Sequence, residues 1–234
     1  MYKSLFLSDF HLGARWNNSQ KLFQLLENIE AEQLFLVGDI VNITASKEHP
    51  EVLRFIELIQ RKPWKIIYIS GNHEDERGKR PPISLSLTEA FFSQDNYIYN
   101  NGQECIYLEH GHHFHQKNQF NKFLRKGLLF IRPLVFRREE SRVVEENKSE
   151  STKEGFYYRF LKPLAQKLLR HSFKSYMYLS AKEKGCTVVV CGHFHIPEDS
   201  MIGKIRYLNC GDWVKNSSCI VENQDGEFSL LQIS

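Results

Sequence analysis

Five clusters of polar residues occur along the chain, each directly after a short apolar run. They read Ser8-Asp9-Phe10-His11, Gly38-Asp39, Gly71-Asn72-His73-Glu74, His110-Gly111-His112 and Gly192-His193-Phe194-His195. In the first and the last cluster the candidate ligands are two residues apart, so in an extended segment both point the same way and can reach one metal ion. Carboxylate, imidazole and amide ligands together suit manganese, iron or zinc, and the lack of thiolates argues against a closed structural zinc site.

Asp39 has a special place among these residues because it lies between the other clusters along the chain. Two metal ions about 4 Å apart need a bridging anion, and a carboxylate can serve as one. A single histidine or aspartate at the end of a strand is usually a capping or solvated residue. Five such clusters in one chain favour a metal centre, with Asp39 as the bridge.

Alternating strands and helices must position the clusters in the amino-terminal part of the chain. Apolar runs predict strands at 2–7, 34–37 and 66–69, and helical spacing of apolar residues predicts helices at 20–29 and 52–59. This alternation is typical of an α/β fold. The carboxyl ends of the strands in such a sheet meet at one edge, where ligands gather.

The remaining strands differ in how they are connected. Turn residues rather than helices separate the last of them, and Asp225-Gly226 marks a hairpin, so we expect this half to be antiparallel. The expected strands are 97–99, 104–109, 187–190, 204–208, 218–221 and 228–233.

A basic segment interrupts these strands. Residues 116–184 contain 17 Lys and Arg against 7 Asp and Glu, a balance of +10, so the rest of the chain, with 14 basic and 21 acidic residues, carries −7. Helices are expected at 120–136 and 156–181, joined by a charged connection at 138–155. We interpret the segment as a helical insertion or lid within a single domain that covers residues 1–234.

Composition limits the remaining classes. With 41% hydrophobic and 25% charged residues, the chain is an ordinary folded protein rather than a disordered one. No stretch approaches the roughly 20 apolar residues of a membrane span. Five cysteines without a CxxC pair argue against a disulfide framework, and Met1 is followed at once by an apolar strand, so we expect no signal peptide and a cytoplasmic location.

The motifs LSDFHLG, VGDI, GNHE, HGH and GHFHIP, taken together and in this order, resemble the calcineurin-like metallophosphoesterase family. The resemblance extends from Leu7 to about Trp213 and leaves only the basic insertion without a counterpart. It implies a four-layer α-β-β-α sandwich of two mixed sheets, and a hydrolase that uses two divalent metal ions, with manganese expected and iron or zinc as alternatives. Asp9, His11, Asp39 and His195 would bind one ion, and Asp39, Asn72, His110 and His193 the other.

The resemblance also implies catalytic roles. Asp39 would serve as the bridge, and His73 would act beside the phosphate or the leaving group without binding metal. Asn72 and His73 would contact the substrate. Where many family members carry an aspartate that orients the catalytic histidine, this chain has Asn42.

Some residues near the motifs leave two interpretations open. His112, His113 and His115 are expected to form a polar loop beside the site rather than to bind substrate. Asp212 and Trp213 either build the turn after a strand or support the ligands from behind.

Within the family, SDFHLG, GHFHIP and the late YLNCGDWV are most similar to the UDP-2,3-diacylglucosamine hydrolases of lipid A synthesis. That resemblance implies cleavage of the pyrophosphate in a lipid-linked nucleotide sugar. The insertion, including Arg125 and Lys126, would then bind the substrate and contact an anionic inner membrane face as a peripheral surface.

Two alternatives remain. One is a phosphodiesterase or phosphatase that acts on another nucleotide, nucleic acid or phosphoester, with the basic segment binding the phosphate backbone. The other is a catalytically inactive binding scaffold.

Overall fold

The computed structural model describes residues 1–42, 44–45, 48–75, 91–93, 95–114 and 162–233. The expected helix at 120–136, the connection at 138–155 and the candidate substrate residues Arg125 and Lys126 lie outside these ranges. The chain divides into two compact units, one of residues 1–112 and 177–234 and one of residues 113–176. The first unit contains both sheets.

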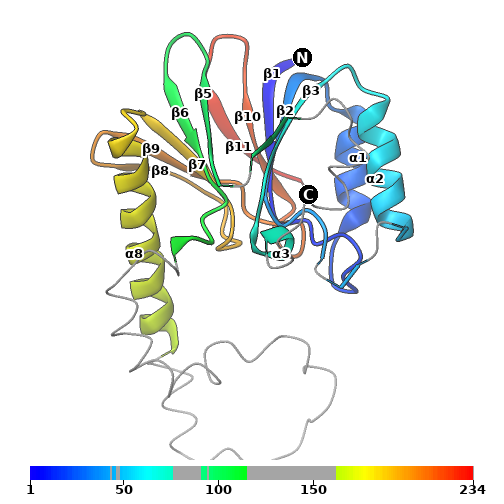
Figure 1. The fold of residues 1–234 in the computed structure, drawn as a ribbon, viewed down its shortest axis with the longest axis horizontal. Helices are drawn as coiled ribbons and strands as arrows, with labels where there is room; N and C mark the ends of the chain where they lie inside the picture. The colour runs from blue at the N-terminus through cyan, green and yellow to red at the C-terminus, as the bar shows by residue number, and fades with distance from the viewer. Residues whose placement is uncertain (43, 46–47, 76–90, 94, 115–161, 234) are drawn as a thin grey trace, which may run out of the picture. The chain divides into compact units, whose positions relative to one another are not determined.

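Six strands form the first sheet, in the order β11-β10-β1-β2-β3-β4 (Figure 1). β1 to β4 are parallel to one another, and β10 and β11 run antiparallel to their neighbours. The bounds are β1 (Tyr2–Leu7), β2 (Ala31–Val37), β3 (Lys65–Ile69), β4 (Phe91–Ser93), β10 (Ser218–Glu222) and β11 (Phe228–Gln232).

Helices α1 (Ser19–Asn28) and α2 (Pro50–Gln60) cover the outer face of this sheet (Figure 1). Each buries an apolar stripe at helical spacing, such as Val52, Phe55, Ile56 and Ile59 of α2. α2 begins with Pro50 at its first position, where the missing N–H has no helical partner anyway. Both helices match the helices expected from the sequence to within two residues at each end.

Five strands form the second sheet, in the order β5-β6-β7-β9-β8. β6, β7 and β9 are parallel, whereas the edge strands β5 and β8 are antiparallel to their neighbours. The bounds are β5 (Tyr97–Asn100), β6 (Cys105–Leu108), β7 (Val188–Cys191), β8 (Glu198–Ile202) and β9 (Ile205–Asn209).

The expectation of an antiparallel second half is therefore wrong for the centre of this sheet. β6 and β7 are separated by a long connection that contains α8 (Lys162–Glu183), and a long crossover allows parallel pairing. β8 follows β7 in the chain but lies at the sheet edge, beyond β9, so β7 and β9 are parallel. The β10–β11 hairpin is antiparallel as expected, but it joins the first sheet.

The two sheets pack face to face around a shared apolar core. Phe6 of β1 stacks on Phe35 of β2 with ring centroids 4.6 Å apart, and both belong to one cluster with Ile106, Val190 and Leu208 of the second sheet. Two mixed sheets packed in an α/β arrangement confirm the expected fold class. α8 confirms the described part of the helix expected at 156–181, and Met177 and Ala181 in its last turns are fully buried.

One cysteine pair differs from expectation. Cys105, the first residue of β6, and Cys186, two residues before β7, form a disulfide with Cα atoms 4.5 Å apart. The other three cysteines are buried and free. The odd cysteine count did not point to this pair because the two residues meet only when the strands align. None of the described helices is long and apolar enough to cross a membrane.

Candidate metal centre

The polar clusters come together at the carboxyl ends of neighbouring strands. The residues that follow β1, β2, β3, β6 and β7 are, in that order, Asp9 and His11, Asp39, Asn72 and His73, His110, and His193 and His195. β3, β2 and β1 are adjacent in the first sheet, and β6 and β7 are adjacent in the second. The site therefore lies where the ends of the two packed sheets meet.

Asp39 lies between histidines from different strands. Its Oδ1 is 3.5 Å from His110 Nε2, and its Oδ2 is 3.9 Å from His11 Nε2 and 3.8 Å from His73 Nε2. The carboxylate is almost fully buried. A carboxylate whose two oxygens face different imidazoles could bridge two cations.

The remaining expected ligands form two groups. His195 Nε2 is 3.1 Å from Asp9 Oδ1 and 3.4 Å from His11 Nε2. His193 Nδ1 is 3.1 Å from Asn72 Oδ1, and the His193 ring is 5.2 Å from that of His110. The structure thus brings all seven expected ligands into one site.

Among the residues that the structure describes, three sets of side chains offer metal-binding atoms that lie within 4.8 Å of one another within each set. They are Asp9 with His11 and His195, Asp39 with His11 and His73, and Asp39 with Asp9 and His110. His73 is close enough to be a ligand itself, whereas the family resemblance implies that it binds no metal.

The backbone at the site is strained. Asp9, His11, Asp39, His193 and His195 all have positive φ, between 50° and 70°. This left-handed region is uncommon for residues other than glycine and costs on the order of 1–3 kcal/mol per residue. The rest of the fold must hold these residues in place, because the strained backbone turns their side chains toward one point.

Two histidines are oriented by hydrogen bonds on the ring nitrogen that faces away from the site. His110 Nδ1 lies 2.8 Å from the Val37 carbonyl oxygen, and His195 Nδ1 lies 3.1 Å from Asp212 Oδ2. A proton on Nδ1 leaves the Nε2 lone pair free for a cation, as in metal sites where a carboxylate or carbonyl supports a histidine. His110 Nε2 is buried and has no hydrogen-bond partner among the described residues, so it fits a metal ion.

Asp212 fills both roles that the sequence left open. Its Oδ1 accepts hydrogen bonds from the backbone N–H groups of Val214, Lys215 and Asn216, which builds the turn after β9. Its Oδ2 faces His195. One carboxylate therefore connects the turn to a candidate ligand.

Charge interactions within the site outweigh burial for most groups. Burial would raise the pKa of Asp9, but the nearby His195 and His110 lower it to about 2. Burial would lower the pKa of His110 and His195, but the carboxylates beside them raise these values to about 9 and about 10. For His11, burial prevails and the pKa falls to about 4. In the absence of metal, two of the histidines thus hold protons that a cation must displace.

Close packing at two glycines leaves no room for a larger residue. A Cβ atom at Gly192 would overlap the Ser8 hydroxyl and Asp9 Oδ2, and one at Gly38 would overlap the His110 ring. The Ser8 hydroxyl contacts Asp9 Oδ2 and lies 2.8 Å from the Val37 carbonyl oxygen. Ser8 thus holds a candidate ligand from behind, a role that the sequence did not reveal.

Asn42 and the histidines just after His110 are not among the candidate ligands. Asn42 donates to Thr44 Oγ1 at 3.0 Å, and no hydrogen bond between its side chain and His73 is found within the described part of the chain. His112 and His113, expected in a polar loop beside the site, are buried, and His115 lies outside the described residues.

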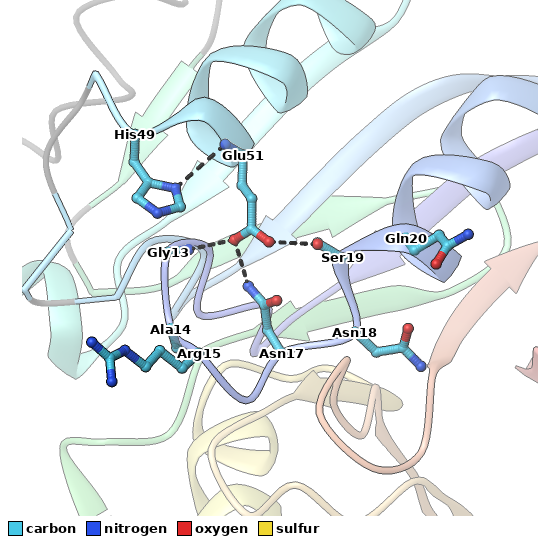
Figure 2. Close-up of a pocket in the computed structure, with 9 residues that line it drawn as sticks. All are labelled: Gly13, Ala14, Arg15, Asn17, Asn18, Ser19, Gln20, His49 and Glu51. Carbon is cyan, nitrogen blue, oxygen red and sulfur yellow. Dashed lines mark hydrogen bonds between the residues drawn. The ribbon is translucent and has the colours of Figure 1, made fainter.

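Sequence reasoning missed the loop that follows His11. This loop lies beside a pocket of about 460 Å³ (Figure 2). Figure 2 shows the Glu51 carboxylate at the centre of hydrogen bonds from Gly13, Asn17 and Ser19. The sequence feature that could have pointed to this loop is Trp16, a large aromatic residue shortly after the first motif. The lining residues are Gly13, Ala14, Arg15, Asn17, Asn18, Ser19, Gln20, His49 and Glu51.

Comparisons with known proteins bear on the family and the fold of the chain. The sequence pattern of the calcineurin-like phosphoesterase family matches residues 2–197. No curated protein matches the chain.

Among solved structures, the chain is similar to an archaeal protein described as a novel phosphodiesterase, with 14% identity over 98% of both chains and a TM-score of 0.52. It is also similar to the phosphoesterase Yfce of E. coli, with 16% identity, 99% of both chains covered and a TM-score of 0.44. Vps29 of Entamoeba histolytica, solved with Zn²⁺, has 12% identity over 99% of both chains and a TM-score of 0.47.

Proposed function

This chain belongs to the calcineurin-like phosphoesterase family, and from that premise we propose that it hydrolyses a phosphodiester or pyrophosphate bond at a centre of two divalent metal ions. The observation that carries the proposal is the position of Asp39, whose two oxygens face His110 on one side and His11 and His73 on the other. A scaffold without catalysis would have no need to retain all seven candidate ligands, five of them in strained backbone conformations.

In this proposal Asp39 would hold both ions. Asp9, His11 and His195 would complete one site, and Asn72, His110 and His193 would complete the other. Bound divalent ions supply Lewis-acid chemistry, which lowers the pKa of water and neutralises charge on the phosphoryl oxygens. Manganese is the expected metal, with iron or zinc as alternatives.

The protein's own residues orient the ligand histidines and donate a proton to the substrate. Val37 and Asp212 fix the rings of His110 and His195 through Nδ1, so that each Nε2 faces the site. His73 is half-buried at the edge of the site and donates a hydrogen bond or proton to the phosphate or the leaving oxygen. Its backbone N–H is fixed by a 2.9 Å hydrogen bond to Asp39 Oδ1.

For the substrate itself, we keep the pyrophosphate of a UDP-diacylglucosamine-like lipid-linked nucleotide sugar as the compound to test first. The support for it is the late YLNCGDWV motif, whose Asp212 lies against His195, together with the +10 balance of residues 116–184. A basic segment of this kind attracts anionic lipid or phosphate, and peripheral contact with an anionic membrane belongs to the same proposal. Another nucleotide, nucleic acid or phosphoester is the alternative substrate.

The test uses metal-depleted protein reloaded with manganese, zinc or iron. Bis-p-nitrophenyl phosphate measures basic phosphodiesterase activity, and nucleotide sugars with and without acyl chains identify the substrate. Asp39→Ala should lower the rate by at least a few orders of magnitude and reduce bound metal, because both ions lose a ligand.

Asp225→Ala, in the exposed turn between β10 and β11, is the matched control and should match the wild type. Full activity of Asp39→Ala with two metal ions still bound would refute the assignment. Turnover of nucleotide sugars without acyl chains alone would refute the lipid part of the proposal and leave the hydrolase part intact.

A further inference from the structure

Trp16 is an exposed aromatic residue at the edge of the metal centre. Its side chain is 44% exposed, and its ring centroid lies 5.1 Å from that of His11. The other two tryptophans are buried, with Trp64 at 7% and Trp213 at 0% exposure. Because burial of an indole is strongly favourable, an indole left in water beside a candidate ligand is suited to contact something that the described residues do not provide.

The loop that carries Trp16 is fastened on both sides. Before Trp16, the Gly13 N–H donates to Glu51 Oε2 at 2.8 Å. After it, the Asn17 side chain donates to the His11 carbonyl oxygen at 3.2 Å and to Glu51 Oε2 at 2.9 Å. The exposure of Trp16 is therefore imposed by a held backbone and does not result from a loose end.

Glu51 is the residue that organises this loop. In addition to those two hydrogen bonds, its Oε1 accepts one from Ser19 at 2.6 Å. Burial would raise the pKa of Glu51, but these hydrogen bonds outweigh it and lower the pKa, so the carboxylate stays ionised. Three charge-assisted hydrogen bonds to one carboxylate hold the loop more firmly than neutral ones would.

The surroundings of Trp16 are polar. Arg15, next to it, is exposed, and Figure 2 shows its side chain extending away from the Glu51 cluster. No ion pair joins Arg15 to a carboxylate in the described ranges. The same loop borders a pocket of about 460 Å³, which residues 13–15 and 17–20 line although Trp16 itself does not. This pocket has the size of a small-molecule site, and its lining consists mainly of amide, hydroxyl and charged groups.

We propose that Trp16 binds the base of a nucleotide substrate by stacking, while the phosphoryl group to be cleaved lies at the metal centre. The inference rests on the proposed hydrolase function and names the substrate class for the same site. A base offers a planar face for the indole and polar edges for the neighbouring pocket. The guanidinium of Arg15, which forms no ion pair with a described carboxylate, attracts the phosphates of the nucleotide. An acyl chain would need an aliphatic surface, which the pocket lining lacks.

The test compares two phosphodiesters that release the same p-nitrophenol. One is the p-nitrophenyl ester of thymidine 5′-phosphate, and the other is methyl p-nitrophenyl phosphate, which has no base. The manganese-loaded wild type should have the higher kcat/KM for the nucleoside ester. Trp16→Leu should reduce this preference by roughly 5- to 100-fold, the effect expected from loss of one stacked base.

Two further variants separate stacking from folding. Trp16→Phe keeps an aromatic ring and should retain more of the preference than Trp16→Leu. Met201→Ala removes another exposed apolar side chain, 62% exposed on β8, and should leave the preference unchanged. Thymidine 5′-monophosphate should also quench the indole fluorescence of the wild type, and it should lose this effect in Trp16→Phe.

The outcomes distinguish this inference from the proposed function. If the wild type hydrolysed both esters with equal kcat/KM, or if Trp16→Leu kept the preference, base stacking would be overturned and the hydrolase function would stand. If neither ester nor any nucleotide sugar were hydrolysed while quenching still depended on Trp16, the proposed function would be wrong and base binding would stand. Absence of both hydrolysis and quenching would overturn both.

Discussion

His73 lies where it could either bind metal or contact the substrate. Its Nε2 is 3.8 Å from Asp39 Oδ2, close enough to bind metal, yet its side chain is more exposed than those of His11 and His110. A ring at the open edge of a metal centre can reach a substrate.

His73→Ala should retain two metal ions and lose roughly 100-fold or more in the rate of phosphodiester hydrolysis, the scale of general acid-base catalysis. Metal content is measured on the same samples as the rate. His171→Ala, an exposed histidine on α8, is the control for loss of an imidazole. Loss of metal in step with activity would make His73 a ligand.

Asp212 allows its two roles to be separated by one substitution. Asp212→Asn keeps a side-chain oxygen for the three backbone N–H groups of the turn but removes the negative charge that faces His195. Metal binding should weaken by about 10- to 100-fold, as is usual when the partner of a ligating histidine is lost. Calorimetric titration with manganese measures the change, with Asp225→Asn as the control.

A loss of fold stability with unchanged metal affinity would show that Asp212 only builds the turn. Stability is measured by urea unfolding of the metal-depleted protein, so that bound metal does not contribute.

At the scale of elements, apolar patterns predicted most of the strands that carry candidate ligands. β1, β3, β6 and β7 lie within two residues of their expected bounds at each end, and each is followed by its motif. Edge strands were harder to predict. β8 (Glu198–Ile202) was missed because its residues are half-buried or exposed and carry little apolar signal.

The pairing of strands and the backbone at their ends could not be predicted in the same way. Residues 104–109 and 187–190 were expected as strands, but nothing local in either segment states that they pair in parallel. The positive φ of Asp39 or His193 is likewise invisible in the sequence, because aspartate and histidine adopt it only when the surrounding fold holds them there.

Glu51 connects an element to the site, since it lies in the first turn of α2 and holds the loop that carries Trp16. Glu51→Ala should lower the free energy of unfolding by roughly 1–3 kcal/mol, because Gly13, Asn17 and Ser19 lose their shared acceptor. Hydrogen exchange in residues 13–19 should become faster.

The control lies on the same helix. Glu57→Ala removes a carboxylate whose side chain is 60% exposed and pairs with Arg61, and exposed pairs of this kind contribute little. Equal losses of stability in the two variants would contradict the role of Glu51 in holding the loop.

At the scale of the whole molecule, residues 116–184 are basic and the rest of the chain is acidic. The acidic body, with a balance of −7, contains the metal centre, and the carboxylates of that centre account for part of the negative charge. An acidic site attracts cations, and protons and metal ions compete for it. Stability should therefore depend on pH in a manner that metal changes.

The direction follows from the folded pKa values. His110 and His195 have pKa values raised to about 9 and about 10, so the stability they contribute to metal-depleted protein is complete below about pH 6.5 and is lost as pH rises through these values. The pKa of His11 is shifted in the opposite direction, to about 4. As pH falls from about 6.5 toward 4, this histidine is protonated in the unfolded chain but not in the folded one, so the fold loses stability. Asp9 loses its contribution only as pH falls toward about 2.

Metal-depleted protein should therefore be most stable near pH 6.5, with a decline toward pH 10. Manganese binds neutral imidazoles, so the rise in melting temperature that it causes should be larger at pH 8.5 than at pH 6.5. Thermal melts across this range, with and without manganese, measure both effects. His195→Asn should flatten the alkaline decline because it removes the highest of the raised pKa values, and His171→Asn should not. If the alkaline decline persisted unchanged in His195→Asn, His195 would not hold a proton that manganese displaces.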